Sequence, residues 1–273
     1  MSAKLPNKSK IHSRPPSGTA AANIYYDSTE RDMGFFGFIL DLTLKLDFVA
    51  FVGKRALDHQ PWEDSDPVSL ASSKPGKYTK YLRENSQLFL ELFLVRMVGN
   101  FQKYLVDILR EILRKEPAIL KSKDSSLTLE TILEFSSMDE LTRHIIERKM
   151  SNLAYNGFSE LRAWATERGI AIKSLDEQKI AEVVATRNLI VHNRSLVDEK
   201  YLKSVQESVL QLGQVRALDV DYFDESVDLL NDSVEQTDNT AIEKFGLDVV
   251  PMATPPDSAP SGDASENEGG QNS

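Results

Sequence analysis

Cysteine is absent from this chain of 273 residues. Without thiols the protein cannot form a disulfide, use a thiolate nucleophile, or hold zinc or an iron–sulfur cluster through sulfur. Histidine is scarce as well, and none of the four lies at ligand-like spacing from another: His12, His59, His144 and His192. The composition therefore predicts no metal site and no cofactor, and it is compatible with a reducing, cytoplasmic compartment.

Long uncharged apolar runs are also missing. The most hydrophobic stretch, residues 33–52 (MGFFGFILDLTLKLDFVAFV), contains Asp41, Lys45 and Asp47. Each charge near a bilayer centre costs about 2.5–3.5 kcal/mol. We expect a helix that is buried over most of its surface and no membrane contact, with membrane association as the alternative. The basic N-terminal residues precede no apolar segment, so no signal peptide is expected.

Positive charge is sparse and unevenly placed. The net charge is −10; residues 1–31 hold five Lys and Arg against two acids, and residues 217–273 hold one against fourteen. The stretch between these ends is neutral. A neutral body is not the strongly basic surface that is typical of constitutive duplex DNA binders.

Helical periodicity extends over most of the chain and predicts an all-α fold, a helical bundle. Apolar residues recur at three- and four-residue steps from 82 to 115, and Pro117 ends that helix. Further helices are expected over 138–155, 158–168, 177–193, 198–212 and 222–245. Ser137 and Ser174 each precede a glutamate by three positions, so they are the expected N-caps of two of these helices.

The composition also divides the chain. Residues 1–23 should be a disordered basic arm and residues 251–273 a disordered acidic tail. Residues 24–81 should form an additional N-terminal helical region and a loop, and residues 82–215 the main helical domain. The acidic segment 216–250 is interpreted as a solvated helix; closure over a positive cleft and binding to a basic partner are the alternatives.

The segment 185–196 (ATRNLIVHNRSL) carries polar side chains in a helix that needs apolar ones. On a helical wheel of residues 177–193, Arg187 falls within a stripe of five aliphatic residues, with Asn188 and His192 on its flank. The stripe consists of Ile180, Val183, Val184, Ile190 and Val191. One explanation is a buried arginine paired with an acid of another helix, beside a histidine that suits the helix C-terminus. The other explanation is an anion-binding site.

Residues 187–192 (RNLIVH) resemble the signature of the HEPN superfamily, whose all-helical domains carry Arg, a polar residue, three further residues and His. The continuation VHNRSLVDEKYL is similar to these domains too, since their motif ends a helix and precedes a turn and a last amphipathic helix. The resemblance covers roughly residues 82–215. Many relatives have a glycine shortly after the motif, whereas this chain has Arg194-Ser195, so the way its turn closes is an open point.

The resemblance implies a homodimer formed through the motif helices and, in many members, a metal-independent endoribonuclease. RNA supplies its own nucleophile, the 2′-OH. By this resemblance His192 would transfer a proton, Arg187 would stabilise the charged phosphorus centre, and Asn188 would orient the imidazole or the phosphate. A cytoplasmic toxin or phage-defence effector with an antitoxin partner would fit this activity. The alternative is a non-catalytic HEPN-like module that binds nucleotide, RNA or a protein.

Further candidates for RNA binding lie next to the motif and in a second segment. Asn193 and Arg194 directly follow His192. Lys77 belongs to residues 74–83 (KPGKYTKYLR), where basic and aromatic residues alternate as in some surfaces that bind single-stranded RNA. A solvated loop that leads into a helix is the preferred interpretation of this second segment.

Overall fold

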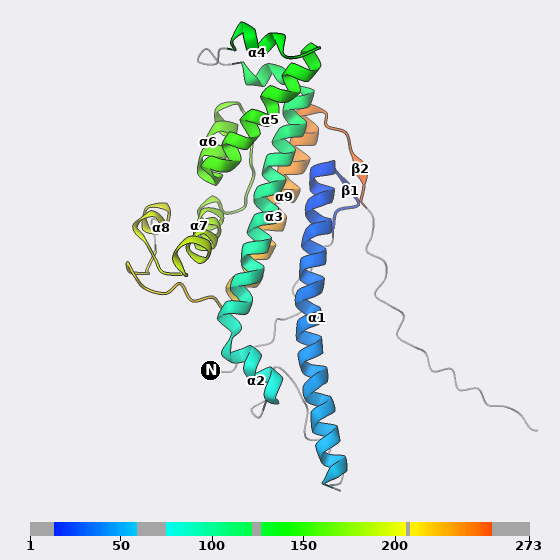
Figure 1. Cartoon of the computed structure of the whole chain (residues 1–273), viewed down its shortest axis with the longest axis vertical. Coiled ribbons are helices and arrows are strands. Elements are labelled where there is room, and N and C mark those ends of the chain that lie inside the picture. The colour runs from blue at the N-terminus through cyan, green and yellow to red at the C-terminus, as the bar shows by residue number, and fades with distance from the viewer. Residues whose placement is uncertain (1–13, 59–74, 122–126, 206–207, 253–273) are drawn as a thin grey trace, which may run out of the picture.

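The computed structural model describes residues 14–58, 75–121, 127–205 and 208–252, and in these ranges the fold is all-α, as the periodicity predicts (Figure 1). Two short strands, β1 (Ser17–Gly18) and β2 (Val250–Pro251), pair antiparallel. The helices are α1 (Ala20–Leu57), α2 (Lys77–Glu84), α3 (Ser86–Lys115), the 3-10 helix η1 (Pro117–Leu120), α4 (Leu129–Leu133), α5 (Met138–Asn156), α6 (Phe158–Glu167), α7 (Glu177–Asn193), α8 (Glu199–Ser204) and α9 (Val220–Phe245).

Helix α3 is the centre of the bundle. It packs against α1, α5, α7 and α9, and twelve of its residues are buried. Helix α9 lies along α3 and contributes the fully buried side chains Phe223, Leu230 and Val234 (Figure 1). The interpretation of 216–250 as a solvated helix is therefore wrong: its apolar residues complete the main core, and one of its acids, Asp238, is buried as well.

Several helix ends follow the local signals. Helix α3 ends before Pro117, and the hydroxyl of Ser137 accepts the N–H of Glu140 at 3.2 Å, as an N-cap does. The expected cap at Ser174 is wrong, because α7 begins later. The carboxylate of Asp176 accepts the N–H of Lys179 at 2.9 Å instead.

The N-terminal arm is shorter than predicted. Residues 14–23, which the composition predicts to be disordered, form β1 and the first turn of α1. Thr19 caps α1, and Asp238 of α9 accepts hydrogen bonds from both the N–H and the hydroxyl of Thr19, at 3.0 and 2.6 Å. The predicted disorder of residues 1–13 and 253–273 concerns parts of the chain outside the described ranges.

Helix α1 contradicts the expectation that residues 33–52 are buried over most of their surface. In this stretch only Asp47 is buried. Its carboxylate caps α2, accepting the N–H groups of Tyr78 and Thr79 at 3.0 and 2.7 Å. Burial would raise the pKa of Asp47, but the hydrogen bonds from Thr79 and Tyr78 hold it below its ordinary value. Among the described helices, none combines the length and apolar character that a membrane-crossing segment requires.

The helix expected over 198–212 is much shorter in the structure, so its predicted length is wrong. Helix α8 ends at Ser204, and residues 213–216 run back beside residues 195–197. Val197 donates its N–H to the carbonyl of Gln214 at 2.9 Å, and Gly213 donates to the carbonyl of Val197 at 2.8 Å. This return loop closes a second, smaller apolar cluster beneath α7, which consists of Ala185, Leu189, Val197 and Tyr201 with Leu202, Val205 and Leu210 at its edge.

Candidate functional site

Helix α7 lies between the main core and the smaller apolar cluster, and this position determines which of its side chains are exposed to solvent. Ile180, Val183 and Val184 are buried in the main core, while Ala185 and Leu189 are buried in the smaller cluster. The two contact faces leave one strip of the C-terminal half of α7 uncovered. This open strip consists of Arg187 at its edge, Asn188, Val191 and His192.

The open strip includes a residue that the helical wheel placed in the packing face. Val191 is 45% exposed, so the prediction that it joins the buried stripe is wrong. An exposed valine between Asn188 and His192 adds an apolar element to an otherwise polar surface.

Arg187 is half-buried and keeps hydrogen-bonding capacity. Its Nη1 donates to the Oδ1 of Asn188 at 3.1 Å. Its Nε is buried without a hydrogen bond, and among the described residues no carboxylate pairs with the guanidinium. The acid partner that one explanation required is therefore not found in this part of the chain. An arginine with unused donors at the edge of an open surface is suited to bind an anion.

His192 is exposed in the last turn of α7. It follows Asn188 by four positions, so the two side chains share one face of the helix. The C-terminal end of a helix carries partial negative charge from its free carbonyl groups. The ring of His192 is open to solvent, so a substrate or a second protein surface could reach it.

The turn after the motif closes without glycine. Arg194 and Ser195 adopt φ angles of 52° and 61°, in the left-handed region. The N–H of Ser195 donates to the carbonyl of Leu189 at 3.1 Å, and its hydroxyl donates to the carboxylate of Glu91 on α3. Asn193 donates its amide to the carbonyl of Leu196 at 2.6 Å. Side-chain hydrogen bonds therefore hold the turn in the conformation that glycine would favour.

The predicted RNA-binding residues are divided between two places. Arg194 is exposed beside His192, whereas the amide of Asn193 is engaged in the turn. Lys77 begins α2, which packs on α1 and on α3, and its Nζ lies 5.8 Å from the ring centre of Tyr78. In the described ranges no hydrogen bond or ion pair joins Lys77 to α7, so the structure does not bring it to the motif.

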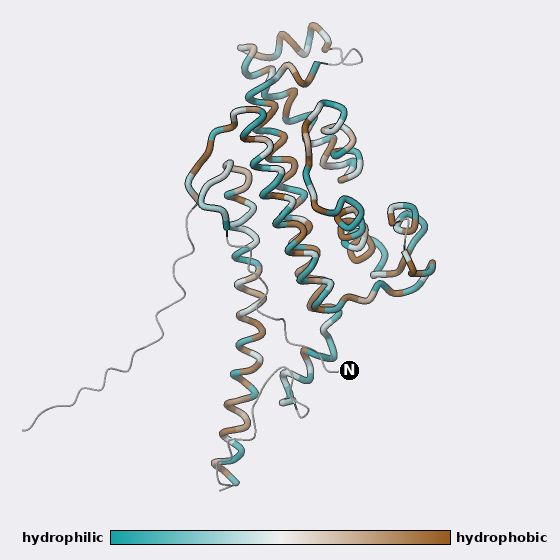
Figure 2. Tube along the Cα trace, turned by 180° about the vertical axis from the view of Figure 1, so that it is seen from behind, coloured by the Kyte–Doolittle hydropathy of each residue, from teal (hydrophilic) through white to brown (hydrophobic). Residues whose placement is uncertain are grey.

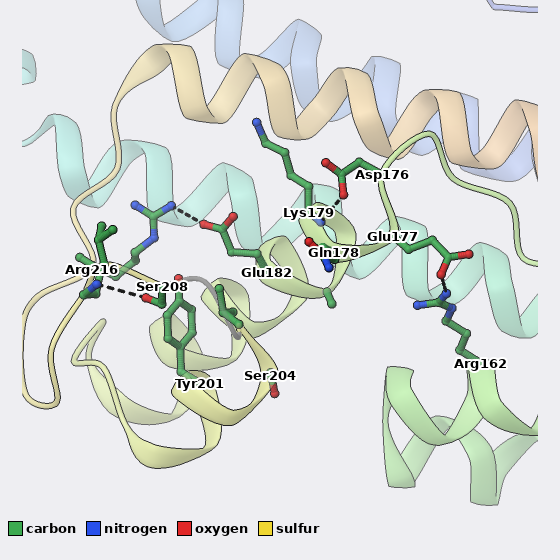
Figure 3. A pocket seen from close by; sticks show the side chains of 14 residues that line it. Arg162, Asp176, Glu177, Gln178, Lys179, Glu182, Tyr201, Ser204, Ser208 and Arg216 are labelled. Atoms are coloured by element: carbon green, nitrogen blue, oxygen red, sulfur yellow. Dashed lines mark hydrogen bonds and ion pairs between the residues drawn. The ribbon is translucent and has the colours of Figure 1, made fainter.

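A cleft of about 630 Å³ is lined by the N-terminal half of α7 on one side and by α8 and residues 208–210 on the other, with Arg162 and Arg216 at its edges (Figure 3). Three basic side chains that line it each form an ion pair: Arg162 with Glu177, Lys179 with Glu225, and Arg216 with Glu182 at 2.9 Å. Neither Arg187 nor His192 lines this cleft. Because its positive charges are already paired with acids, the cleft is less suited to bind an anion than the open strip is.

Arg216 is a residue of this region that the sequence did not single out, and the sequence does not specify the role of Ser195 in closing the turn. The guanidinium of Arg216 lies 4.2 Å from the ring centre of Tyr222, and burial raises the pKa of that tyrosine to about 12. Arg216 also pairs with Glu182 of α7. Ser195 bonds to Glu91 of α3, so both residues connect segments that are distant in sequence. No local spacing marks such contacts, so only the folded chain could identify them.

Comparison with protein-family models, with curated proteins and with solved structures finds no match for this chain. The resemblance to HEPN domains therefore rests on residues 187–192, on the turn that follows them and on the order of the helices.

Proposed function

We propose that this protein is a HEPN-like, metal-independent endoribonuclease that acts as a homodimer through the open strip of α7. The observation that supports the proposal is the strip itself, where an arginine with unused donors and an exposed histidine flank an exposed valine. In a two-fold dimer the same strip faces itself, so Val191 supplies apolar contact and each chain supplies one His192.

The chemistry needs only groups that two such strips contain. One His192 takes the proton of the 2′-OH, whose oxygen then attacks the adjacent phosphorus. The second His192 gives a proton to the departing 5′-oxygen, so that a 2′,3′-cyclic phosphate and a 5′-OH end result. Arg187 stabilises the extra negative charge on the phosphoryl oxygens. The proposed setting is a cytoplasmic toxin or phage-defence effector that an antitoxin restrains.

A cleavage assay in EDTA tests this proposal with a matched pair of histidine variants. Wild type should cut RNA and leave 2′,3′-cyclic phosphate ends. His192→Ala should lose activity by about 10²-fold or more, since general acid–base groups contribute at least that much. His144→Ala removes another exposed histidine, on α5, and should leave activity unchanged. Both variants should melt close to wild type, because both side chains are exposed.

Unchanged cleavage by His192→Ala would refute the assignment. A loss of activity that is accompanied by a large loss of thermal stability would show instead that His192 acts through the fold. His192→Gln, which keeps the size and polarity of the side chain without its proton transfer, distinguishes these cases: it should remain folded and inactive.

A non-catalytic HEPN-like module is the second candidate function. It is favoured by the bond between Arg187 and Asn188, which ties the arginine to its own helix, and by the position of the large cleft away from the motif. On this candidate the strip binds nucleotide, RNA or a protein without cutting. Wild type would then show no cleavage at any pH from about 6 to 8, and Arg187→Ala would dissociate or unfold the protein.

A further inference from the structure

The outer side of α1 carries an apolar stripe in which only Phe35 has a ring contact with another described helix, 6.4 Å between its ring centre and that of Phe93 on α3. The stripe consists of Phe35, Phe38, Leu42, Leu46 and Val49, which follow one another by three or four positions and are between 41% and 65% exposed. Figure 2 shows hydrophobic residues along the lower half of α1, which extends well past the end of α3. We refer to these five residues as the α1 stripe.

The opposite face of α1 is already used within the chain. The ring of Phe36 lies 4.8 Å from that of Phe89 on α3 and 5.4 Å from that of Phe223 on α9. Farther along, Asp47 caps α2. Helix α1 thus carries apolar side chains on more than one side, and a helix that is hydrophobic all round is normally buried all round. Its inner side packs within the chain, whereas the α1 stripe lies outside the main core and, among the described helices, only its Phe35 has a ring contact with another helix.

The pattern of the stripe specifies what could cover it. No charged residue interrupts it, and its steps of three and four residues average close to the 3.5-residue repeat of paired helices. The nearest charges, Asp41 and Lys45, lie together on one flank and pair with each other at 2.7 Å. Such a face fits another helix with the same uncharged stripe and the same mixed charges at its edge.

We propose that the α1 stripe docks antiparallel onto the α1 stripe of a second copy of this chain. Centred on Leu42, this pairing sets Phe38 against Leu46 of the second copy and Phe35 against its Val49, so each large side chain meets a smaller one. On the flank, Asp41 comes near Lys45 of the second copy, and the reciprocal pair forms by symmetry. Charge complementarity at the edge and alternating size in the centre both favour this partner.

The size of the stripe predicts how firmly the copies associate. An exposed half of a phenylalanine side chain contributes about 100 Å², so the five residues offer on the order of 400 Å² per chain. The paired stripes would bury less than the roughly 1,200 Å² of a stable interface, which is the range of transient complexes. We therefore expect association that depends on concentration.

This contact is separate from the proposed dimer through α7, since the two surfaces belong to different helices. It does not depend on ribonuclease activity. A chain that used both contacts would form a tetramer or a longer array. The informative quantity is therefore the mass of each variant relative to that of wild type at the same concentration.

Sedimentation of the full chain from about 1 to about 100 µM tests the proposal. The average mass of wild type should increase with concentration. The largest mass that Leu42→Glu reaches should be about half that of wild type, because the two-fold axis places the two new carboxylates face to face. Leu42→Lys should behave in the same way. Tyr155→Glu is the matched control, since Tyr155 is 92% exposed on α5 and away from the stripe, and it should associate like wild type. Far-UV circular dichroism verifies that each variant is folded.

Cross-linking tests the antiparallel direction. The chain has no cysteine, so any disulfide comes from an introduced thiol. A mixture of Phe38→Cys and Leu46→Cys chains should oxidise mainly to mixed dimers, because these positions face each other across the proposed axis. Cross-links only between identical variants would indicate a parallel pair and would overturn the antiparallel arrangement.

A vesicle assay separates the second copy from a membrane as the occupant. Wild type that stays at one mass at all concentrations overturns the proposal. If that protein also co-sediments with vesicles of phosphatidylcholine and phosphatidylglycerol while Leu42→Glu does not, the stripe is a membrane surface. Association that Leu42→Glu and Leu42→Lys both leave intact likewise overturns the proposal.

Discussion

Arg194 and Ser195 close the turn after the motif helix without a glycine. Both hold left-handed backbone angles, which cost an L-residue about 1–2 kcal/mol each. The two residues offset that cost differently. Ser195 is buried and bonds to Glu91, whereas Arg194 is exposed and its side chain makes no hydrogen bond among those found in the described ranges.

Arg194→Gly should therefore stabilise the protein. Glycine accepts a φ of 52° without a Cβ clash, and we expect a gain of about 1 kcal/mol, or roughly 2–4 °C in the melting temperature. Asn193→Gly is the control, because Asn193 is the last helical residue and its amide bonds to Leu196; that variant should lose stability. Thermal unfolding measures both. An equal loss in the two variants would show that the arginine side chain stabilises the turn.

The anchoring of α1 to α9 is an interaction between elements that involves a buried acid. Asp238 accepts hydrogen bonds from Thr19, and the hydroxyl of Tyr104 lies 3.4 Å from its carboxylate. Burial raises the pKa of Asp238 above its ordinary value of 3.8, although the bonds from Thr19 and Tyr104 oppose the rise. Ionising this carboxyl in the folded protein is therefore unfavourable relative to the unfolded chain.

The raised pKa of Asp238 gives stability a predictable pH dependence. A group whose pKa is higher in the folded state contributes stability below its unfolded pKa, and that contribution is lost as the pH rises through the folded pKa. Asp238→Asn cannot ionise. The free energy of unfolding of Asp238→Asn should therefore increase relative to that of wild type as the pH rises from about 4 to about 7.

Urea denaturation at several pH values measures this difference. Glu243→Gln neutralises an exposed acid of the same helix, and its difference from wild type should stay nearly constant with pH. A difference for Asp238→Asn that falls with rising pH would mean that the carboxylate is stabilised by its hydrogen bonds more than it is penalised by burial.

At the scale of the whole molecule, the described residues share one main core, to which the first and the last described helix, α1 and α9, both contribute. Tyr25 of α1, Phe101 of α3, Trp164 of α6 and Leu230 of α9 all belong to one apolar cluster. The acidic C-terminal helix and the segment that resembles a HEPN domain therefore share their stabilising contacts. We expect them to unfold together.

Leu230→Ala should destabilise the entire protein by about 2–5 kcal/mol, because a fully buried leucine leaves a cavity. In a Trp62→Phe background, Trp164 is the sole tryptophan and reports on α6. Its fluorescence and the helical circular dichroism should shift together in urea. Val249→Ala, at a position 48% exposed, should change little. A Trp164 transition that Leu230→Ala leaves in place would show two independent units.

Much of the secondary structure and part of the site could be predicted from the sequence. The end of α3 before Pro117, the cap at Ser137, and the placement of Arg187, Asn188 and His192 on one helix depend on neighbours within a few positions. Local rules for helix periodicity and capping suffice for such features. The contact of Ser195 with Glu91 could not be predicted, since 104 positions separate the two residues.

By itself the sequence determined that this is a helical protein without thiol chemistry and with an Arg-Asn-x-x-x-His helix. The absence of thiols follows from the composition alone, and the helices follow from periodicity, which depends on residues a few positions apart. Only the tertiary structure decided which apolar faces are covered. It buried α9, left Val191 open, cut α8 to one short helix and exposed the outer face of α1. The physical reason is that an apolar side chain is stabilised equally well by any surface that excludes water, and the sequence of one helix does not specify which surface that is.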